Sequence, residues 1–194
     1  MAVQESSRSR LDFPTGQLLI LLKKQTDSCK LSASPWKTCR LHFGEFRLNE
    51  RVRFQLSSAV FVILARGAEI CMLRRKATGW MDGSFSLPAG GLDAGETIRA
   101  AAAREAFEET GVVIAPEALK SVHTLHSLTA DSPWIGHFFR TEEWTGTPTL
   151  CEPDKHDNLQ WRKLDNLPGN TIPYVRQALV CIARNEPYSE YGWE

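Results

Sequence analysis

The fold is decided by one stretch of the 194-residue chain, Gly90-Gly-Leu-Asp-Ala-Gly-Glu96-Thr-Ile-Arg-Ala-Ala-Ala-Ala-Arg104-Glu105-Ala106-Phe-Glu108-Glu109-Thr-Gly111-Val112. This stretch predicts a glycine-rich loop followed by a helix over residues 97–110 that ends at Gly111. Positions i, i+3 and i+4 share one helix face, so the carboxylates of Glu105, Glu108 and Glu109 converge. Such a pattern alone is more often a solvated acidic face. Three hard oxygen ligands of this kind would suit Mg²⁺ or Mn²⁺, and the pattern of the whole segment decides between these two interpretations.

The spacing of this stretch also matches a family motif. Gly90 is followed by five residues, Glu96, seven residues, and Arg104-Glu105-Ala106-x-Glu108-Glu109-x-Gly111-Val112. This resembles the Nudix box, G-x5-E-x7-R-E-U-x-E-E-x-G-U with U aliphatic, at every single-residue position. A chance match at seven such positions has a frequency of roughly one in 10⁸ per starting point. Only Ala106 departs from the usual pattern, because bulkier aliphatic residues are common there.

The resemblance implies an α/β fold, namely a Nudix α/β/α sandwich with a mixed β-sheet. It also implies hydrolysis of a nucleoside diphosphate linked to another moiety, with Glu105, Glu108 and Glu109 as metal ligands. The resemblance covers the chain from about residue 59 onward. We therefore assign residues 57–194 to a Nudix hydrolase domain and residues 1–56 to an N-terminal extension of unknown fold. Residues 1–16 of this extension are rich in Ser and Arg and are expected to be disordered.

Hydrophobic patterns on both sides of the motif agree with this fold. Residues 59–65 and 69–74 predict a β-hairpin, and residues 119–128, 134–140 and 159–161 predict further strands. A final helix is expected over residues 171–185, with Asn170 or Thr171 as its N-cap. Strands in succession with one helix between them and one at the end indicate an α/β layered domain with a mixed sheet.

Composition and charge narrow the class of protein. The longest apolar runs are far shorter than the roughly 20 residues of a membrane helix, and the N-terminus lacks a signal core. The five cysteines form no paired framework, so we expect reduced thiols in an intracellular, cytoplasmic protein. Formal net charge is zero, yet residues 1–56 hold ten Lys and Arg against five Asp and Glu. The positive charge of residues 1–56 would allow contact with an RNA cap, although nucleic acid is not the expected partner.

Roles for the other motif residues follow from their chemistry. Glu96 lies at the helix start, where a carboxylate favours the dipole, and it can pair with Arg104. Arg104 cannot ligate a cation, so it is expected to hold carboxylates in place or to contact a phosphate. The backbones of Gly90 and Gly91 can approach a substrate closely. Either Glu105 or Glu108 could accept the proton of the attacking water, and the sequence leaves this choice open.

Residues outside the motif complete the expected site. Arg74 ends a strand before the catalytic loop and could attract phosphates, and Trp80 could stack a nucleobase. Glu152 is expected to add a fourth carboxylate to the metal from a loop between two strands, with Asp154 and Asp157 as competitors. The alternative for each of these positions is an ordinary surface or packing residue.

The expected substrate is a nucleoside triphosphate or modified deoxynucleotide, split into monophosphate and pyrophosphate. ADP-ribose, a dinucleoside polyphosphate or an RNA cap are the alternatives. A Nudix domain that senses nucleotides without cleaving them is an alternative of another class, although all four glutamates of the motif are present. The expected partner is thus a small nucleotide substrate. We expect no contact with a membrane, and a homodimer is possible.

Overall fold

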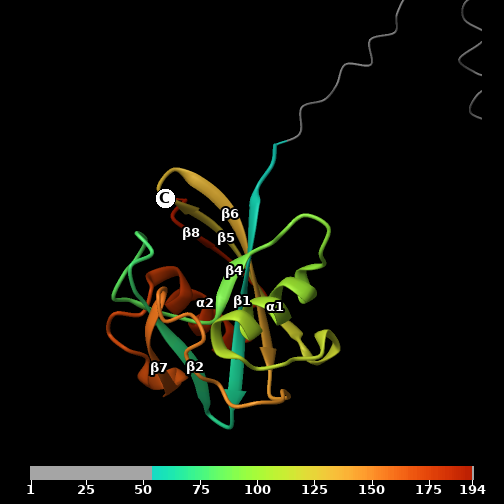
Figure 1. Ribbon diagram of the computed structural model, residues 1–194. Helices are drawn as coiled ribbons and strands as arrows, with labels where there is room; N and C mark the ends of the chain where they lie inside the picture. Colours follow the sequence, from blue (N-terminus) through green and yellow to red (C-terminus); the bar gives the residue numbers. More distant parts are fainter. Residues whose placement is uncertain (1–53, 194) are drawn as a thin grey trace, which may run out of the picture. The chain divides into compact units, whose positions relative to one another are not determined.

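The central element of the computed structural model, which describes residues 54–193, is the long strand β1 (Ser57–Arg66) (Figure 1). Strand β1 forms a hairpin with β2 (Glu69–Arg75) and pairs in parallel with β6 (Ser132–Thr141). Strand β6 pairs antiparallel with β5 (Lys120–Thr129), and β5 pairs in parallel with β8 (Tyr188–Tyr191). The sheet is therefore mixed, as expected from the sequence.

Three further strands extend this sheet around β1 and β2. Strand β7 (His156–Lys163) and the two-residue strand β3 (Phe85–Ser86) both pair antiparallel with β2. Strand β4 (Ala89–Gly91) pairs antiparallel with β1, which sets Gly90 opposite Val60. The sequence did not predict β3 or β4, because strands of two or three residues carry no hydrophobic period.

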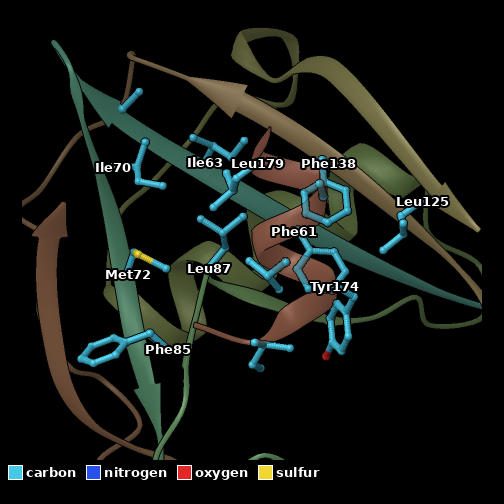
Figure 2. Close-up of a cluster of buried hydrophobic side chains, with 14 residues drawn as sticks. Phe61, Ile63, Ile70, Met72, Phe85, Leu87, Leu125, Phe138, Tyr174 and Leu179 are labelled. Atoms are coloured by element: carbon cyan, nitrogen blue, oxygen red, sulfur yellow. The ribbon is translucent and has the colours of Figure 1, made fainter. Parts of the chain in front are cut away.

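The two faces of β1 contribute to two different hydrophobic cores. Phe61, Ile63 and Ala65 point to a cluster that includes Val175 and Leu179 of helix α2 (Pro173–Ala183), as Figure 2 shows for its labelled members. The alternate residues Val60, Val62 and Leu64 point to a cluster with Ala102 and Ala106 of helix α1 (Ile98–Thr110). Successive side chains of a strand face opposite sides, so β1 is buried on both faces. The helices cover opposite faces of the sheet, which confirms the α/β/α sandwich.

Local signals set both ends of helix α1. The Thr97 side chain caps the helix by accepting a hydrogen bond from the Ala100 N–H at 3.2 Å. Gly111 takes the left-handed conformation with φ of 72°, and its N–H donates to the Phe107 carbonyl. The predicted helix over residues 97–110 is confirmed within one residue. The small residues Ala101, Ala102 and Ala106 let it lie close to the sheet.

The predicted start of helix α2 was wrong. The helix begins at Pro173, its N-cap is Ile172, and this residue provides no side-chain cap. A proline disfavours the helical conformation of the residue before it, so Ile172 stays extended and the helix starts at the proline. The Asn170 side chain instead donates to the Gly83 carbonyl, and Thr171 forms a bridge with Phe85. Helix α2 ends at Ala183, two residues before the expected end.

Two further expectations concern membrane contact and the N-terminal extension. In the described part of the chain, no helix is long and apolar enough to cross a membrane. The expectations for residues 1–56, including disorder of residues 1–16, fall almost entirely outside the described residues and stay predictions. Two short 3₁₀ helices, Pro116–Ala118 and Leu164–Asn166, complete the described elements.

Candidate active site and metal centre

Helix α1 holds the carboxylate of Glu105 against the backbone of β4. A Cβ atom built on Gly90 would lie 2.0 Å from Cδ of Glu105, far inside van der Waals contact. Only glycine leaves room for the Glu105 carboxylate in this position, while the expected approach of the Gly90 backbone to a substrate stays a prediction. A Cβ atom on Gly91 would meet nothing within 4 Å. The close contact between β4 and the Glu105 carboxylate therefore requires glycine at position 90 and not at position 91.

Arg104 connects the carboxylates of the motif. Its Nη1 lies 2.7 Å from Oε1 of Glu105 and 3.2 Å from Oε2 of Glu108. Its Nη2 lies 2.7 Å from Oε1 of Glu96 and also donates to the Gly91 carbonyl at 3.0 Å. The Arg104 guanidinium lowers the pKa of Glu96, and the carboxylates raise the pKa of Arg104. Arg104 thus holds carboxylates in place, one of its two expected roles.

Glu109 is the buried member of the acidic cluster, with 5% of its surface exposed. It follows Ala102 and Ala106 on the buried face of α1, and its Oε2 accepts a hydrogen bond from the Ala89 N–H at 3.0 Å. Burial raises the pKa of Glu109 to about 8. Glu108 lies at the rim, with 46% of its side chain exposed. The exposure of Glu105 lies between that of Glu109 and that of Glu108, and burial also raises the pKa of Glu105.

The loop before β7 brings further groups to the same place. One ligand atom each of Glu109, Glu152 and His156 lie within 4.8 Å of one another, a spacing that could hold a metal ion. His156 is buried, and burial lowers the pKa of its ring. Lys155 Nζ lies 2.7 Å from Oε1 of Glu152. The structure therefore places Glu152 beside the helix carboxylates.

The two acidic competitors of Glu152 lie apart from it, Asp154 in the same loop and Asp157 in strand β7. Asp157 is paired with Arg74, whose Nε lies 2.6 Å from its Oδ1. This contact lowers the pKa of Asp157. Asp154 is exposed and is not part of the cluster. Of the three acids considered for this role, the structure brings Glu152 to the buried carboxylate.

The expected substrate contacts lie on and after β2. Arg74 is partly exposed at the end of the strand and carries the ion pair with Asp157. Trp80 is 40% exposed, and its carbonyl accepts a hydrogen bond from Arg75 Nε at 2.8 Å. Arg75 also donates to Thr78 Oγ1, so it fixes the turn that presents the Trp80 ring. Among the described side-chain hydrogen bonds, none joins Arg74 or Trp80 to a carboxylate of α1 or to Glu152.

Sequence reasoning gave no role to His156 or Lys155. The missed signal was the start of β7, which begins at His156 and not at Leu159. An earlier start sets His156 opposite Arg75 of β2, and its side chain then points inward. A polar residue that opens a half-buried strand is the feature that would have identified this position.

Comparison with known proteins agrees with the geometry. The sequence model of the NUDIX domain matches residues 55–179. An NAD-capped RNA hydrolase NudC of Stutzerimonas stutzeri is 30% identical over 118 residues, which cover 59% of this chain and 39% of that protein. An RNA pyrophosphohydrolase of Erythrobacter litoralis is 29% identical over 119 residues, 53% of this chain and 73% of that protein.

A solved structure extends the likeness to the fold. The crystal structure of a MutT NUDIX hydrolase from Burkholderia pseudomallei aligns with a TM-score of 0.61 and 26% identity, covering 66% of this chain and 98% of that one. By contrast, the chain spans less than half of the NudC relative. The family match covers well over half of the chain and includes Glu96, Arg104 and the three glutamates of α1. The chain belongs to the NUDIX domain family.

Proposed function

We propose that this chain hydrolyses a nucleoside triphosphate or a modified deoxynucleoside triphosphate to the monophosphate and pyrophosphate. One observation carries the proposal: carboxylates from α1 and from the loop before β7 converge beside the backbone of β4, with Glu109 buried. The likeness to the solved MutT NUDIX hydrolase, which is covered over 98% of its length, supports hydrolysis as the reaction.

The donor set fits a divalent cation. Glu109 is buried, and among residues 54–193 neither Lys nor Arg forms an ion pair with it. A buried carboxylate without a cation is unfavourable unless a metal or a proton compensates. We propose Mg²⁺, or Mn²⁺ in its place, held by Glu105, Glu108, Glu109 and Glu152. Such an ion would neutralise diphosphate oxygens and lower the pKa of a bound water.

The residues of the chain would then divide the remaining tasks. Glu105 is our candidate for the general base, because Gly90 and Arg104 fix its carboxylate while that of Glu108 is half exposed. The oxygen of water attacks phosphorus, the proton passes to the carboxylate, and the P–O bond to the leaving phosphate group breaks. Arg104 acts through the carboxylates it holds.

Substrate contacts are proposed at both sides of this centre. The backbones of Gly90 and Gly91 border the carboxylates, and they are the proposed contacts of the diphosphate. The exposed ring of Trp80 offers a face on which a base could stack. Arg74 would attract phosphates once its exposed ion pair with Asp157 opens, since such pairs contribute little energy.

Cleavage of a diphosphate at the 5′ end of RNA is a second candidate. The observation that favours it is the identity of about 30% to relatives named NAD-capped RNA hydrolase and RNA pyrophosphohydrolase. The chemistry at phosphorus would be the same. The two candidates differ in whether an RNA chain is attached to the 3′ side of the first nucleotide.

One panel separates these functions. We would incubate the full chain and Mg²⁺ with nucleoside triphosphates, oxidised dGTP, ADP-ribose, triphosphorylated RNA and NAD-capped RNA, and follow the products by ³¹P NMR. The Glu108→Gln variant serves as the blank. We expect pyrophosphate from a nucleoside triphosphate. Turnover of the RNA substrates alone would establish the second candidate, and tight nucleotide binding without any turnover would show a nucleotide sensor.

A further inference from the structure

His156 is a buried histidine whose ring faces the acidic cluster. It is 3% exposed, and its Nε2 lies 3.7 Å from Oε1 of Glu109, beyond hydrogen-bond distance. The backbone fixes this position, because the His156 N–H donates to the Glu152 carbonyl at 2.9 Å and the residue pairs with Arg75 of β2. The ring is thus held beside Glu109 by the sheet.

The ring lacks the partners that a structural histidine has. Its Nδ1 is buried without a hydrogen-bond partner among the described residues. His123 provides a contrast within the same chain, because it is equally buried and both of its nitrogens are satisfied. They contact the Glu186 carbonyl at 2.8 Å and Ser189 Oγ at 2.9 Å. Buried polar groups are normally satisfied, so the arrangement of His156 needs another explanation.

Carboxylate oxygens lie near the other nitrogen of the ring, Nε2, and a metal ion between them is an explanation for a buried ring at this position. Glu109 and Glu152 each bring an oxygen within 4.8 Å of a His156 nitrogen and of one another. The Lys155 ammonium contacts only Oε1 of Glu152, so the other oxygen stays available. Two carboxylates and an imidazole form a donor set that suits Mn²⁺ and other first-row transition ions better than Mg²⁺, which prefers oxygen alone.

We infer that His156 is an imidazole ligand of the metal site and makes that site prefer Mn²⁺ over Mg²⁺. This inference rests on the proposed function, since it places the same ion among Glu109 and Glu152. It adds a ligand that the motif does not contain. It also assigns a cause for metal preference, because an imidazole discriminates between these ions and a carboxylate does so less.

Mn²⁺ binding to the full chain tests the inference without measuring turnover. Electron spin echo spectra of bound Mn²⁺ report a directly coordinated ¹⁴N, and the free-ion signal gives the affinity. We expect nitrogen coupling in the wild type and its loss in His156→Gln. The variant should bind Mn²⁺ roughly tenfold more weakly, with competing Mg²⁺ changed by less than about threefold. His126→Gln is the matched control, because that histidine packs on Trp193 outside the cluster.

The outcomes separate this inference from the proposed function. Mn²⁺ that binds the wild type without nitrogen coupling, or with coupling that survives in His156→Gln, overturns the role of His156 and leaves the hydrolase proposal intact. Mn²⁺ binding that is unchanged in Glu109→Gln overturns the proposed metal site itself. If circular dichroism shows that His156→Gln does not fold, His156→Asn replaces it. The spectrum of the wild type decides the inference independently of either variant.

Discussion

The two helices of the described domain face the sheet with side chains of very different size. Helix α1 buries Ala101, Ala102 and Ala106, whereas α2 buries larger residues that include Val175 and Leu179. Full burial of a leucine contributes about 1.5–3 kcal/mol, and an alanine contributes far less. Apolar area therefore stabilises α2 much more than α1.

Helix α1 compensates with polar contacts at defined points. Thr97 caps its first turn, Arg104 joins it to the loop through Glu96 and Gly91, and Glu109 contacts the backbone of β4. The alanines allow the helix to approach the sheet closely, which brings the Glu105 carboxylate to Gly90. The helix with the site is thus positioned by specific contacts, and the helix opposite is positioned by burial.

The largest expected effect is on stability, from Leu179→Ala in α2. Leu179 is almost fully buried, so its truncation should lower the free energy of unfolding by about 2–5 kcal/mol. Urea denaturation of the full chain measures this change. The adjacent Val180 is 42% exposed, and Val180→Ala should change the value by less than about 0.5 kcal/mol. Equal effects of the two substitutions would contradict the burial account of α2.

In α1, the largest effect should be on the reaction. We expect Glu108→Gln and Glu109→Gln each to lower kcat by about 100-fold or more, equivalent to about 2.7 kcal/mol, because each removes a proposed metal ligand. Folding should survive, since removing one of several like charges relieves repulsion. Steady-state rates at saturating substrate and Mg²⁺ test this expectation. Glu117→Gln, an exposed acid in the first 3₁₀ helix, is the control. Near-native rates in either variant would refute its ligand role.

A pair of glycine substitutions tests the close approach of α1 to β4. Gly90→Ala places a methyl group on the Glu105 carboxylate and should lower kcat by roughly tenfold to a hundredfold, because small displacements of reacting groups are costly. Gly91→Ala meets open space and should retain most of the activity. Thermal unfolding of both variants separates misplacement from loss of fold. Similar rates for the two would show that the contact at Gly90 is unimportant.

Glu152 extends the comparison to a carboxylate outside the helix. Glu152→Gln should weaken the apparent Mg²⁺ affinity or lower kcat at least about tenfold, which corresponds to about 1.4 kcal/mol. Mg²⁺ titration of the reaction rate provides the measurement. Asp154→Asn is the matched control from the same loop, because Asp154 lies outside the cluster. If Asp154→Asn weakens Mg²⁺ affinity or lowers kcat and Glu152→Gln does not, Asp154 is the ligand and Glu152 is not.

The smallest expected effect is at the N-terminus of α1. Thr97→Ala removes the cap and should lower stability by about 1 kcal/mol, measured by urea denaturation. Thr97→Ser keeps the hydroxyl group and should restore most of that loss. Helix α2 has no side-chain cap and starts at Pro173, so it offers no equivalent position. A Thr97→Ala variant as stable as the wild type would show that the cap is dispensable for α1.

The sequence by itself determined the elements whose signals are local. Thr97 and Gly111 mark the ends of α1 because a cap and a left-handed residue act on adjacent backbone groups. Strands β1, β2, β5 and β6 were predictable from their apolar runs. The start of α2 was missed, although Pro173 is a local signal, because Asn170 and Thr171 also have the chemistry of caps. The short strands β3 and β4 were missed because two or three residues carry no hydrophobic period.

For the site, helical periodicity predicts that Glu105, Glu108 and Glu109 share one helix face. In the structure Arg104 contacts Glu105 and Glu108, whereas Glu109 lies beside Glu152 and His156. Periodicity did not reveal that Glu109 would be buried and Glu108 exposed, although Glu109 continues the stripe of Ala102 and Ala106. Glu152 could only be nominated from the sequence, and His156 was not identified. Pairing of β7 with β2 decides both positions, since it places a loop more than forty residues from α1 beside Glu109. Contacts between such distant segments depend on strand register, which no local pattern fixes, so only the tertiary structure could show which groups share the site.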